Sequence, residues 1–291
     1  MNDTAHQKSE RSAVLRYTAF DVDGEGGNPA GVVLDARGMD DTRMQEVAAE
    51  VGFSETAFLT DDRGGRRFRI RYFSPLAEVA FCGHATIATA VALAERQGTG
   101  ALRLVTSAGE IGVETRAANG RILATLTSVV PSVGEVGAAD LATALTALRW
   151  SAADLDPRLP PRIANAGNDH LVLAASSRAR LADLDYDQAA LGDLMARRGW
   201  TTVHLVWRET ATVFHARDPF PPGGVVEDPA TGAAAAAFGG YLRSLGLVEP
   251  PARITIRQGE DMGRPSRLLV DVPPGDGSGI RVSGAAAPIP G

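Results

Sequence analysis

The sequence predicts an α+β protein made of two similar domains, each with a strongly curved sheet around one helix. Three observations support this fold class. The length of 291 residues allows two domains. The same landmarks recur in the same order about 140–150 residues apart. In each copy, β-type segments surround a helix whose first turns hold mostly small residues, and small side chains let a helix lie close to the surrounding backbone.

Each copy begins with a Gly-Asn pair before an apolar β-type run, AGVVL in the first copy and DHLVLAA in the second. An amphipathic helix follows and stops at a glycine, the residue that most readily takes the left-handed conformation closing a helix. A short β-type run comes next, then an Ala-rich helix that opens and ends at glycine, then alternating strand segments with a Gly-Glu pair. The matched landmarks are Asn28 and Asn168 (140 apart), Gly52 and Gly199 (147), Gly83 and Gly232 (149), Gly98 and Gly246 (148), and Gly109 and Gly259 (150).

We place the boundary near the turn-rich stretch 131–137, PSVGEVG, which divides the chain into domains 1–130 and 131–291. In this division, the last strand of the chain can still join the sheet of the first domain. The polar start, residues 1–13, and the tail from Gly284 are expected to be loose.

Composition excludes several classes of partner. The net charge is −6 and the arginines are scattered, so no basic stripe is available for nucleic acid. The first 13 residues lack the apolar core of a signal peptide, and no apolar run approaches the ~18 residues of a membrane span. Cys82 is the single cysteine and cannot form an intrachain disulfide, which suits a reducing cytosol. We therefore expect a soluble cytoplasmic protein.

The two Ala-rich helices suggest where a ligand binds. Their first residues, Gly83 and Gly232, expose unpaired N–H groups and the positive end of a helix dipole, which favour an anion such as a carboxylate. The alternative is that these glycines only permit a tight turn into the helix. The favoured ligand is a small acid.

Polar residues that break the repeat are the candidates for chemistry. Glu55, in GFSETAFL, matches Thr202 and stands among apolar residues, where burial would disfavour the carboxylate and suit it to carry a proton. His84 matches Ala233 and lies at a helix start, where the dipole disfavours imidazolium. Asp228 precedes a helix in VEDPATG. The competing interpretations are an exposed Glu at the start of a strand, a capping or merely buried His, and an N-cap or Asx-turn Asp.

Other chemistries do not fit. A dinucleotide fingerprint would need a glycine where Pro29 stands, and neither a phosphate loop nor a G-x-S-x-G elbow occurs. A racemase with two opposed thiols needs two cysteines. We predict no metal, because the other histidines lack ligand spacing. Those are His6, His170, His204 and His215.

Five ordered motifs between Arg16 and Val272 resemble the PhzF-like family of phenazine-biosynthesis isomerases, which share the diaminopimelate-epimerase fold. The motifs are FDVDGEGGNPAGVVL, FSETAFL, EVAFCGHATIATA, VEDPATGAAAAAF and RQGEDMGRPS. The resemblance implies two similar pseudo-symmetric domains, each an antiparallel barrel-like sheet around a central helix, with the active site in the cleft between them.

The resemblance also implies residue roles. Glu55 corresponds to the family's general acid/base, while His84 and Asp228 correspond to groups that help hold the substrate and its moving charge. We expect Asn28, Gly83, Gly232 and Ala233 to bind the substrate. The phenazine enzyme isomerises trans-2,3-dihydro-3-hydroxyanthranilate by moving a proton between ring carbons, without a cofactor.

The chain departs from the family pattern after D-P-A-T-G, where the phenazine enzyme has Ser and this chain has Ala233. The missing hydroxyl puts the substrate in doubt more than the catalytic Glu. Cys82 stands where the epimerases have one catalytic thiol, and we interpret it as a small buried residue.

The sequence thus favours a cofactor-independent isomerase of secondary metabolism acting on a small carboxylated, cyclic substrate. An epimerase or dehydratase using the same Glu is the second interpretation, and a catalytically idle binding protein is the third. A homodimer is a candidate assembly. A retained desolvated carboxylic acid argues against the idle protein, because it costs stability.

Overall fold

The computed structural model describes residues 14–290; the predicted loose start, residues 1–13, lies outside them. The chain divides into two compact units. Unit 1 holds residues up to Thr127 together with Ser283 onward, and unit 2 holds Ser128–Val282. The division into domains 1–130 and 131–291 stays a prediction, and each unit is described by itself.

Unit 1 is a closed barrel of eight strands. They pair in the order β17, β1, β2, β3, β4, β6, β7, β8, and β8 pairs with β17 to close the ring. A two-residue strand, β5, pairs with the end of β4. The bounds are β1 Leu15–Ala19, β2 Asn28–Val33, β3 Glu55–Asp62, β4 Arg67–Phe73, β5 Glu78–Val79, β6 Gly100–Thr106, β7 Gly109–Ala118, β8 Arg121–Thr127 and β17 Arg281–Pro288.

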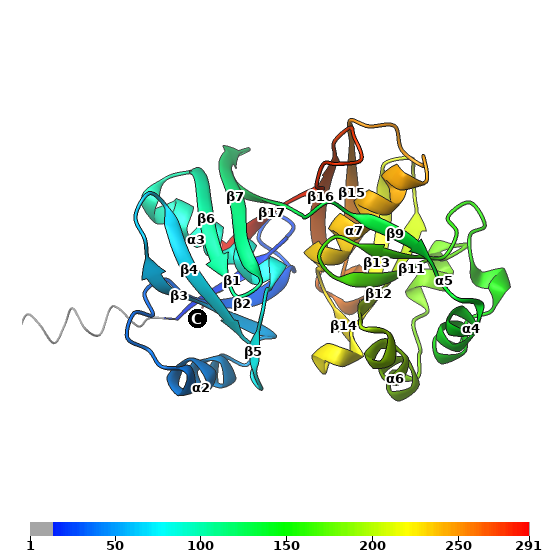
Figure 1. The fold of residues 1–291 in the computed structure, drawn as a ribbon, viewed down its shortest axis with the longest axis horizontal. Helices are drawn as coiled ribbons and strands as arrows, with labels where there is room; N and C mark the ends of the chain where they lie inside the picture. Colours follow the sequence, from blue (N-terminus) through cyan, green and yellow to red (C-terminus); the bar gives the residue numbers. More distant parts are fainter. Residues whose placement is uncertain (1–13, 291) are drawn as a thin grey trace, which may run out of the picture. The chain divides into compact units, whose positions relative to one another are not determined.

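Helix α3, Gly83–Gln97, is the central helix of unit 1 (Figure 1). Every residue from His84 to Ala94 is buried, and the helix packs on β1, β2, β3, β7 and β8. A helix that is buried all round has no polar face, and after His84 the run ATIATAVALA meets this need with small or apolar side chains. Helix α2, Asp41–Val51, packs instead on β3 and β4 through Met44, Val47 and Ala48.

Unit 2 repeats this order of elements. Its strands pair as β9, β10, β11, β12, β13, β15, β16, and β14 pairs with the end of β13. The central helix is α7, Gly232–Ser244, buried from Ala234 to Leu242. The strand bounds are β9 Ser132–Glu135, β10 Arg162–Asn165, β11 Asp169–Ala174, β12 Trp200–Arg208, β13 Val213–Pro219, β14 Glu227–Asp228, β15 Ala252–Gln258 and β16 Ser266–Val272.

The outer helices of unit 2 form an apolar cluster with the sheet, and Leu171, Leu191 and Trp200 are among its buried residues. These helices are α4 Ala138–Ala147, α5 Arg178–Ala182 and α6 Gln188–Arg198. Helix α6 corresponds to α2, and both end at the predicted glycines. Gly52 and Gly199 adopt left-handed conformations with φ of 71° and 70°, and each N–H bonds back into its helix.

The sheets are mixed where the resemblance implied antiparallel ones. In unit 1, β2 pairs with β3 and β4 with β6 in parallel, and in unit 2 the equivalent pairs β11 with β12 and β13 with β15 are also parallel. The physical reason is the connection: a helix lies between the two strands of each pair, and a crossover through a helix returns the chain in the same direction.

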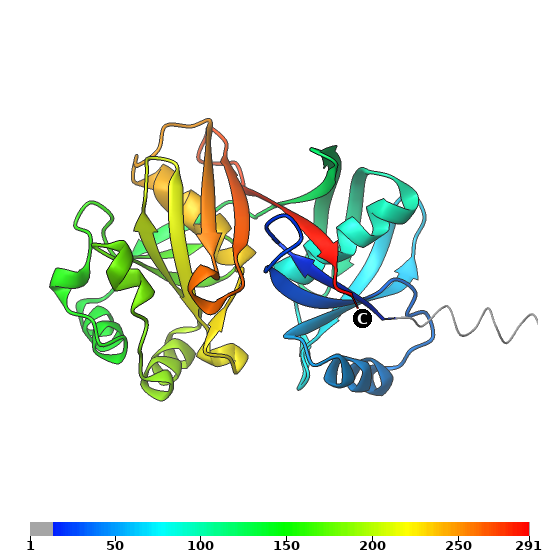
Figure 2. The same ribbon diagram turned by 180° about the vertical axis from the view of Figure 1, so that it is seen from behind.

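Two local expectations are wrong. The stretch 131–137, expected to be rich in turns, contains β9, where Gly134 pairs with Ile163 of β10. The tail from Gly284, expected to be loose, belongs to β17, which lies beside β1 in Figure 2. In both cases the segment becomes a strand because its backbone pairs with a strand that is distant in the sequence. Strands pair through main-chain N–H and C=O groups, so segments rich in glycine and alanine can also form them.

Candidate active site

Glu55 and His84 lie side by side in unit 1. Glu55 is the first residue of β3, and His84 is the second residue of α3. Glu55 Oε2 is 3.3 Å from His84 Nε2, and the two side chains are only 15% and 7% exposed. Ser54 Oγ is also 3.3 Å from Nε2. The arrangement sets a carboxyl group beside an imidazole ring at a largely buried position.

The other ring nitrogen of His84 faces two further side chains. Asn28 Nδ2 lies 3.2 Å from Nδ1, and Cys82 Sγ lies 3.4 Å from it. Asn28 is the first residue of β2, and Cys82 is the buried N-cap residue of α3. The prediction that Cys82 is a small buried residue is confirmed. His84 is therefore held on both edges of its ring.

Burial lowers the pKa of His84, and the nearby Glu55 carboxylate and a hydrogen bond with the Pro29 carbonyl oppose this shift. The sequence predicted the same direction from the helix dipole, whereas the larger cause here is loss of water. Burial therefore favours the uncharged imidazole, which lies within 3.3 Å of the Glu55 carboxyl oxygen.

Backbone geometry fixes these side chains. The start of β2 pairs with the start of β3 in parallel, with Ala30 opposite Glu55. Gly27, just before β2, has a φ of +73°, and a Cβ there would lie 2.4 Å from Thr18 Oγ1 and 2.7 Å from the Ala19 carbonyl oxygen. Only glycine fits this position, which directly precedes Asn28, the residue that contacts Nδ1 of His84.

Glu55, Cys82 and His84 form a group that could hold a metal ion, with ligand atoms that all lie within 4.8 Å of one another. The spacing of histidines in the sequence could not reveal this group, because its members come from two segments and only one of them is a histidine.

Asp228, Gly232 and Ala233 form a second group, in unit 2. Asp228 ends β14, Gly232 and Ala233 begin α7, and Asp228 accepts a hydrogen bond from Thr231 Oγ1 at 2.7 Å. Thr231, not Asp228, is the N-cap residue of α7, so the N-cap interpretation of Asp228 is wrong. The physical reason is that the helix starts four residues after Asp228, beyond the reach of a cap.

Gln258, at the end of β15, ties this segment together. Its Nε2 donates to the Asp228 carbonyl at 2.7 Å and to Thr231 Oγ1 at 3.0 Å, and its Oε1 accepts from the Thr231 N–H at 3.1 Å. The next residue, Gly259, has a φ of +75°, and a Cβ there would lie 2.3 Å from the Arg264 carbonyl oxygen and 2.8 Å from that of Pro229. The RQG sequence therefore supports the D-P-A-T-G segment through side-chain and backbone contacts.

Sequence reasoning singled out neither Ser54 nor Gln258 as a site residue. Ser54 adjoins Glu55 in the FSETAFL motif, and Gln258 belongs to RQGEDMGRPS, so both lie within quoted motifs. Their roles depend on partners 30 and 27 residues away, His84 and Thr231 respectively, which no local pattern shows.

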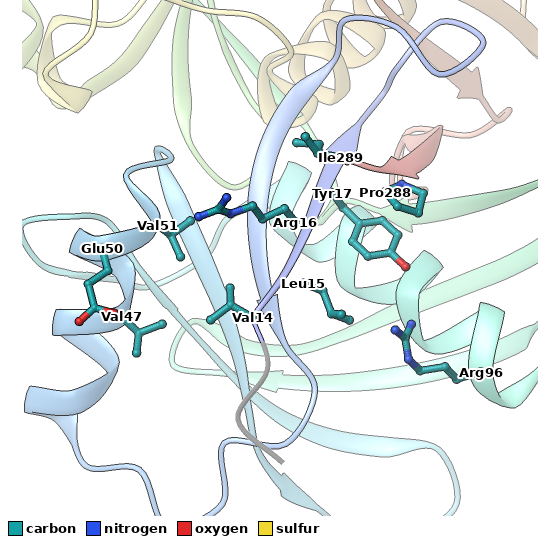
Figure 3. Close-up of a pocket in the computed structure, with 10 residues that line it drawn as sticks. All are labelled: Val14, Leu15, Arg16, Tyr17, Val47, Glu50, Val51, Arg96, Pro288 and Ile289. Atoms are coloured by element: carbon teal, nitrogen blue, oxygen red, sulfur yellow. The ribbon is translucent and has the colours of Figure 1, made fainter. Parts of the chain in front are cut away.

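A pocket of about 540 Å³ lies elsewhere in unit 1, lined by β1, α2, the end of α3 and the end of β17 (Figure 3). Arg16 reaches toward Val51 of α2, and Tyr17 lies on the opposite side of β1, toward Arg96. Neither Glu55 nor His84 lines this pocket, so it is separate from the candidate active site. Among residues 14–290, no helix is both long enough and apolar enough to span a membrane.

Comparisons with known proteins give one consistent answer. The family model for phenazine biosynthesis-like proteins matches residues 17–290. An uncharacterized isomerase of Mesorhizobium japonicum is 32% identical, with 89% of each chain covered. Trans-2,3-dihydro-3-hydroxyanthranilate isomerase of Pseudomonas chlororaphis is 34% identical, with 84% of each chain covered. These names support the predicted isomerase class.

Solved structures agree with this result. The chain matches a PhzF-family phenazine biosynthesis protein of Bacillus anthracis with a TM-score of 0.84 and 25% identity, covering 95% of this chain and 96% of the other. A predicted epimerase of Pseudomonas aeruginosa gives a TM-score of 0.80 at 29% identity, covering 95% and 97%. The family match over most of the length, the recurring α+β units and the relatives together show that the chain belongs to the phenazine biosynthesis-like, or PhzF, family.

Proposed function

We propose that this chain moves a proton between two carbons of a small carboxylated, cyclic substrate, with Glu55 as the group that carries the proton. The observation that supports this best is the buried contact of 3.3 Å between Glu55 and an uncharged His84 at the start of α3. A carboxylate with little water around it and an imidazole beside it is suited to accept and return a proton.

The reaction proceeds by proton transfer alone. Glu55 takes a proton from an acidic C–H of the substrate and leaves the electron pair delocalised over the neighbouring carbons. The protonated Glu55 then delivers the proton to a different carbon, so no atom is gained or lost. Because there is no net oxidation, we propose that no redox cofactor takes part.

The first turn of α3 contributes to binding. The N–H groups of Gly83 and the residues after it are at a helix N-terminus, where backbone donors and the dipole favour a carboxylate. Asn28 and Ser54 hold the His84 ring from its two edges. The roles of Asp228, Gly232 and Ala233 in substrate binding stay predictions.

Epimerisation is the second candidate, because a relative of similar fold has been described as a predicted epimerase. In that reaction Glu55 would take part in exchanging a proton at a single carbon. The two reactions differ in where a solvent proton appears in the product, and the experiment below separates them.

Replacing Glu55 by Gln tests the assignment. The amide keeps the shape of the side chain but cannot carry the proton, so folding and ligand binding should survive while turnover falls by roughly 10²–10⁴. The measurement is turnover over a panel of cyclic carboxylates, with thermal unfolding and ligand binding as controls. Near-normal turnover by Glu55→Gln would assign the proton transfer to another group.

Turnover in deuterated water identifies the reaction. The migration reaction should place solvent deuterium at the carbon that gains the proton, whenever protonated Glu55 exchanges before delivery. Epimerisation should place it at the carbon whose configuration inverts. Tight binding of one carboxylate without turnover of any would support the idle binding protein instead.

A further inference from the structure

Two buried hydroxyl groups hold the residue that precedes α3. Tyr72 lies on β4 and Thr86 in the first turn of α3, with Tyr72 Oη 2.6 Å from Thr86 Oγ1. Thr86 Oγ1 donates its one proton to the Cys82 carbonyl at 2.6 Å, so Tyr72 is the donor in the bond between the two hydroxyls. The Thr86 N–H donates to the same carbonyl at 3.1 Å. These contacts therefore run from a strand to the N-cap residue of α3.

The two hydroxyls are out of reach of water. Tyr72 and Thr86 are both 0% exposed. Burial also raises the pKa of the Tyr72 phenol well above its usual value, so the phenol keeps its proton and stays a donor. Consecutive hydrogen bonds strengthen one another in a dry interior, and a buried hydroxyl that loses its partner is costly. We therefore expect these groups to keep one arrangement.

The same contacts connect the elements that carry Glu55 and His84. The Cys82 carbonyl belongs to the planar peptide unit that leads into α3, and His84 follows two residues after Cys82. On the other side, Tyr72 lies opposite Ala57 where β4 pairs with β3, and Ala57 is two residues from Glu55. The strand that carries Glu55 and the helix turn that carries His84 are therefore joined through Tyr72.

We propose that Tyr72 and Thr86 are positioning residues, whose hydroxyls hold the first turn of α3 so that His84 stays 3.3 Å from Glu55. Without the Tyr72 hydroxyl, Thr86 loses its link to β4, and the turn that carries His84 can shift relative to β3. The effect on turnover rests on the function proposed above, whereas the effect on the His84 ring does not.

Nuclear magnetic resonance of the His84 ring in the substrate-free chain tests the positioning directly. The ring signals are assigned by their loss in His84→Asn. In Tyr72→Phe and Thr86→Val, which each remove one hydroxyl at almost unchanged shape, these signals should shift and broaden. Thr86→Ser keeps the hydroxyl and should keep the signals of the unmodified chain. Thermal unfolding of each variant shows whether the fold is retained.

Thr89→Val is the matched control. Thr89 lies in the same helix, is fully buried, and its Oγ1 donates to the Ala85 carbonyl at 2.7 Å. Its replacement removes the same kind of bond and should lower the unfolding temperature, yet it should leave the His84 signals unchanged. A role in stability alone would lower the unfolding temperature in Tyr72→Phe, Thr86→Val and Thr89→Val alike, without a change at His84.

The double variant Tyr72→Phe/Thr86→Val tests whether the two hydroxyls act in series. Once Thr86 has no hydroxyl, Tyr72 is disconnected from Cys82, so the double variant should resemble Thr86→Val alone. Where turnover is measurable, kcat should fall by roughly 10–100-fold in each single variant, since a misplacement of about 1 Å costs on the order of 10² in rate. Thr86→Ser should restore kcat. Losses that add in the double variant would overturn the series.

The two proposals fail separately. Unchanged His84 signals in folded Tyr72→Phe and Thr86→Val overturn the positioning role whatever the activity. Altered signals with the expected variant pattern support it even if Glu55→Gln leaves turnover normal, a result that would overturn only the proton-carrying role of Glu55. Altered signals without a fall in kcat, where Glu55→Gln does abolish turnover, overturn the link between this positioning and catalysis.

Discussion

Ala233 stands where the resemblance to the phenazine enzyme implies a serine. It is the second residue of α7 and carries no hydroxyl. We predict poor turnover of trans-2,3-dihydro-3-hydroxyanthranilate by the unmodified chain and partial recovery in Ala233→Ser. One neutral hydrogen bond is worth about 0.5–1.5 kcal/mol, so the gain in kcat/KM should be about tenfold or less. Efficient isomerisation by the unmodified chain would mean that Ala233 does not change the substrate, and the proposed role of Glu55 would be unaffected.

We predict that His170 makes the stability of unit 2 depend on pH. It is fully buried, its Nδ1 lies 2.8 Å from Thr202 Oγ1, and Thr202 in turn donates to Asp218. Burial, reinforced by the neighbouring His204, lowers the pKa of His170 to about 3. In the unfolded chain this residue gains its proton near pH 6.5. Between about pH 6.5 and 3 the unfolded state therefore binds one more proton, and stability falls as the pH falls, by up to ~1.4 kcal/mol per pH unit.

The variant His170→Asn should flatten this dependence, because an amide keeps a hydrogen-bonding group near Thr202 but does not titrate. The measurement is the free energy of unfolding between pH 7 and 4. Thr202→Val is the control: it removes the hydrogen bond and lowers stability, yet it keeps the titrating ring and should keep the slope. Equal slopes in the unmodified chain and His170→Asn would show that His170 is not the source.

At the scale of elements, Gln258 joins the end of β15 to the segment that begins α7. Its side chain is 1% exposed and forms hydrogen bonds with three polar groups. These are the Asp228 carbonyl, the Thr231 N–H and the Thr231 hydroxyl. Gln258→Leu leaves both backbone groups buried without this partner, at about 1–3 kcal/mol each, so we expect unfolding free energy to fall by at least about 2 kcal/mol. Denaturant unfolding measures the change.

Gln45→Leu, the same substitution in α2, provides the comparison. Gln45 is half-buried, and its Nε2 donates a single hydrogen bond, to the Ser74 carbonyl at 2.8 Å. Its loss should cost about 0.5–1.5 kcal/mol. Equal losses in the two variants would mean that Gln258 is not a special support of the segment.

The elements differ in how far the sequence predicts them. Both central helices and both outer helices that end at Gly52 and Gly199 are confirmed, because burial all round and a left-handed stop leave local patterns. The parallel strand pairs and β9 leave no local sequence pattern that would predict them, because their partner strands come from distant segments. The same holds for the site: Glu55 and His84 stand out as polar residues that break the repeat, whereas the contacts of Ser54 and Gln258 become evident only when distant strands and helices are in place.

At the scale of the molecule, the two units share an order of strands and helices but carry different side chains at equivalent positions. The parallel pair β2 and β3 sets Ala30 opposite Glu55, and the equivalent pair β11 and β12 sets His170 opposite Thr202. In unit 1 this position holds a carboxylate beside His84, and in unit 2 it holds a fully buried hydroxyl that bonds to His170 and Asp218. The proposed proton carrier therefore belongs to one copy, while its counterpart is part of a core.

The C-terminal strand makes the barrel of unit 1 dependent on the last residues of the chain. Strand β17 pairs with β1 and β8, the Phe20 N–H donates to the Ala285 carbonyl at 2.7 Å, and Thr125 Oγ1 meets Ser283 Oγ at 2.8 Å. Gly284 lies against the ring of Phe20, where a Cβ would come within 2.2 Å of it. Closing a ring between residues so far apart in sequence is slow in folding, and without β17 two edges are left unpaired.

We predict that a chain ending at Ile280 loses amide protection in β1 and β8, the Phe20 N–H most clearly, while the amides of α7 and β15 in unit 2 keep theirs. A chain ending at Ile289 is the control, because it retains all of β17 and should exchange like the full chain. Hydrogen exchange read residue by residue measures both. Unchanged protection of Phe20 in the shorter chain would mean that β1 and β8 hold together without β17, and the barrel would then owe its stability to α3 and the remaining strands alone.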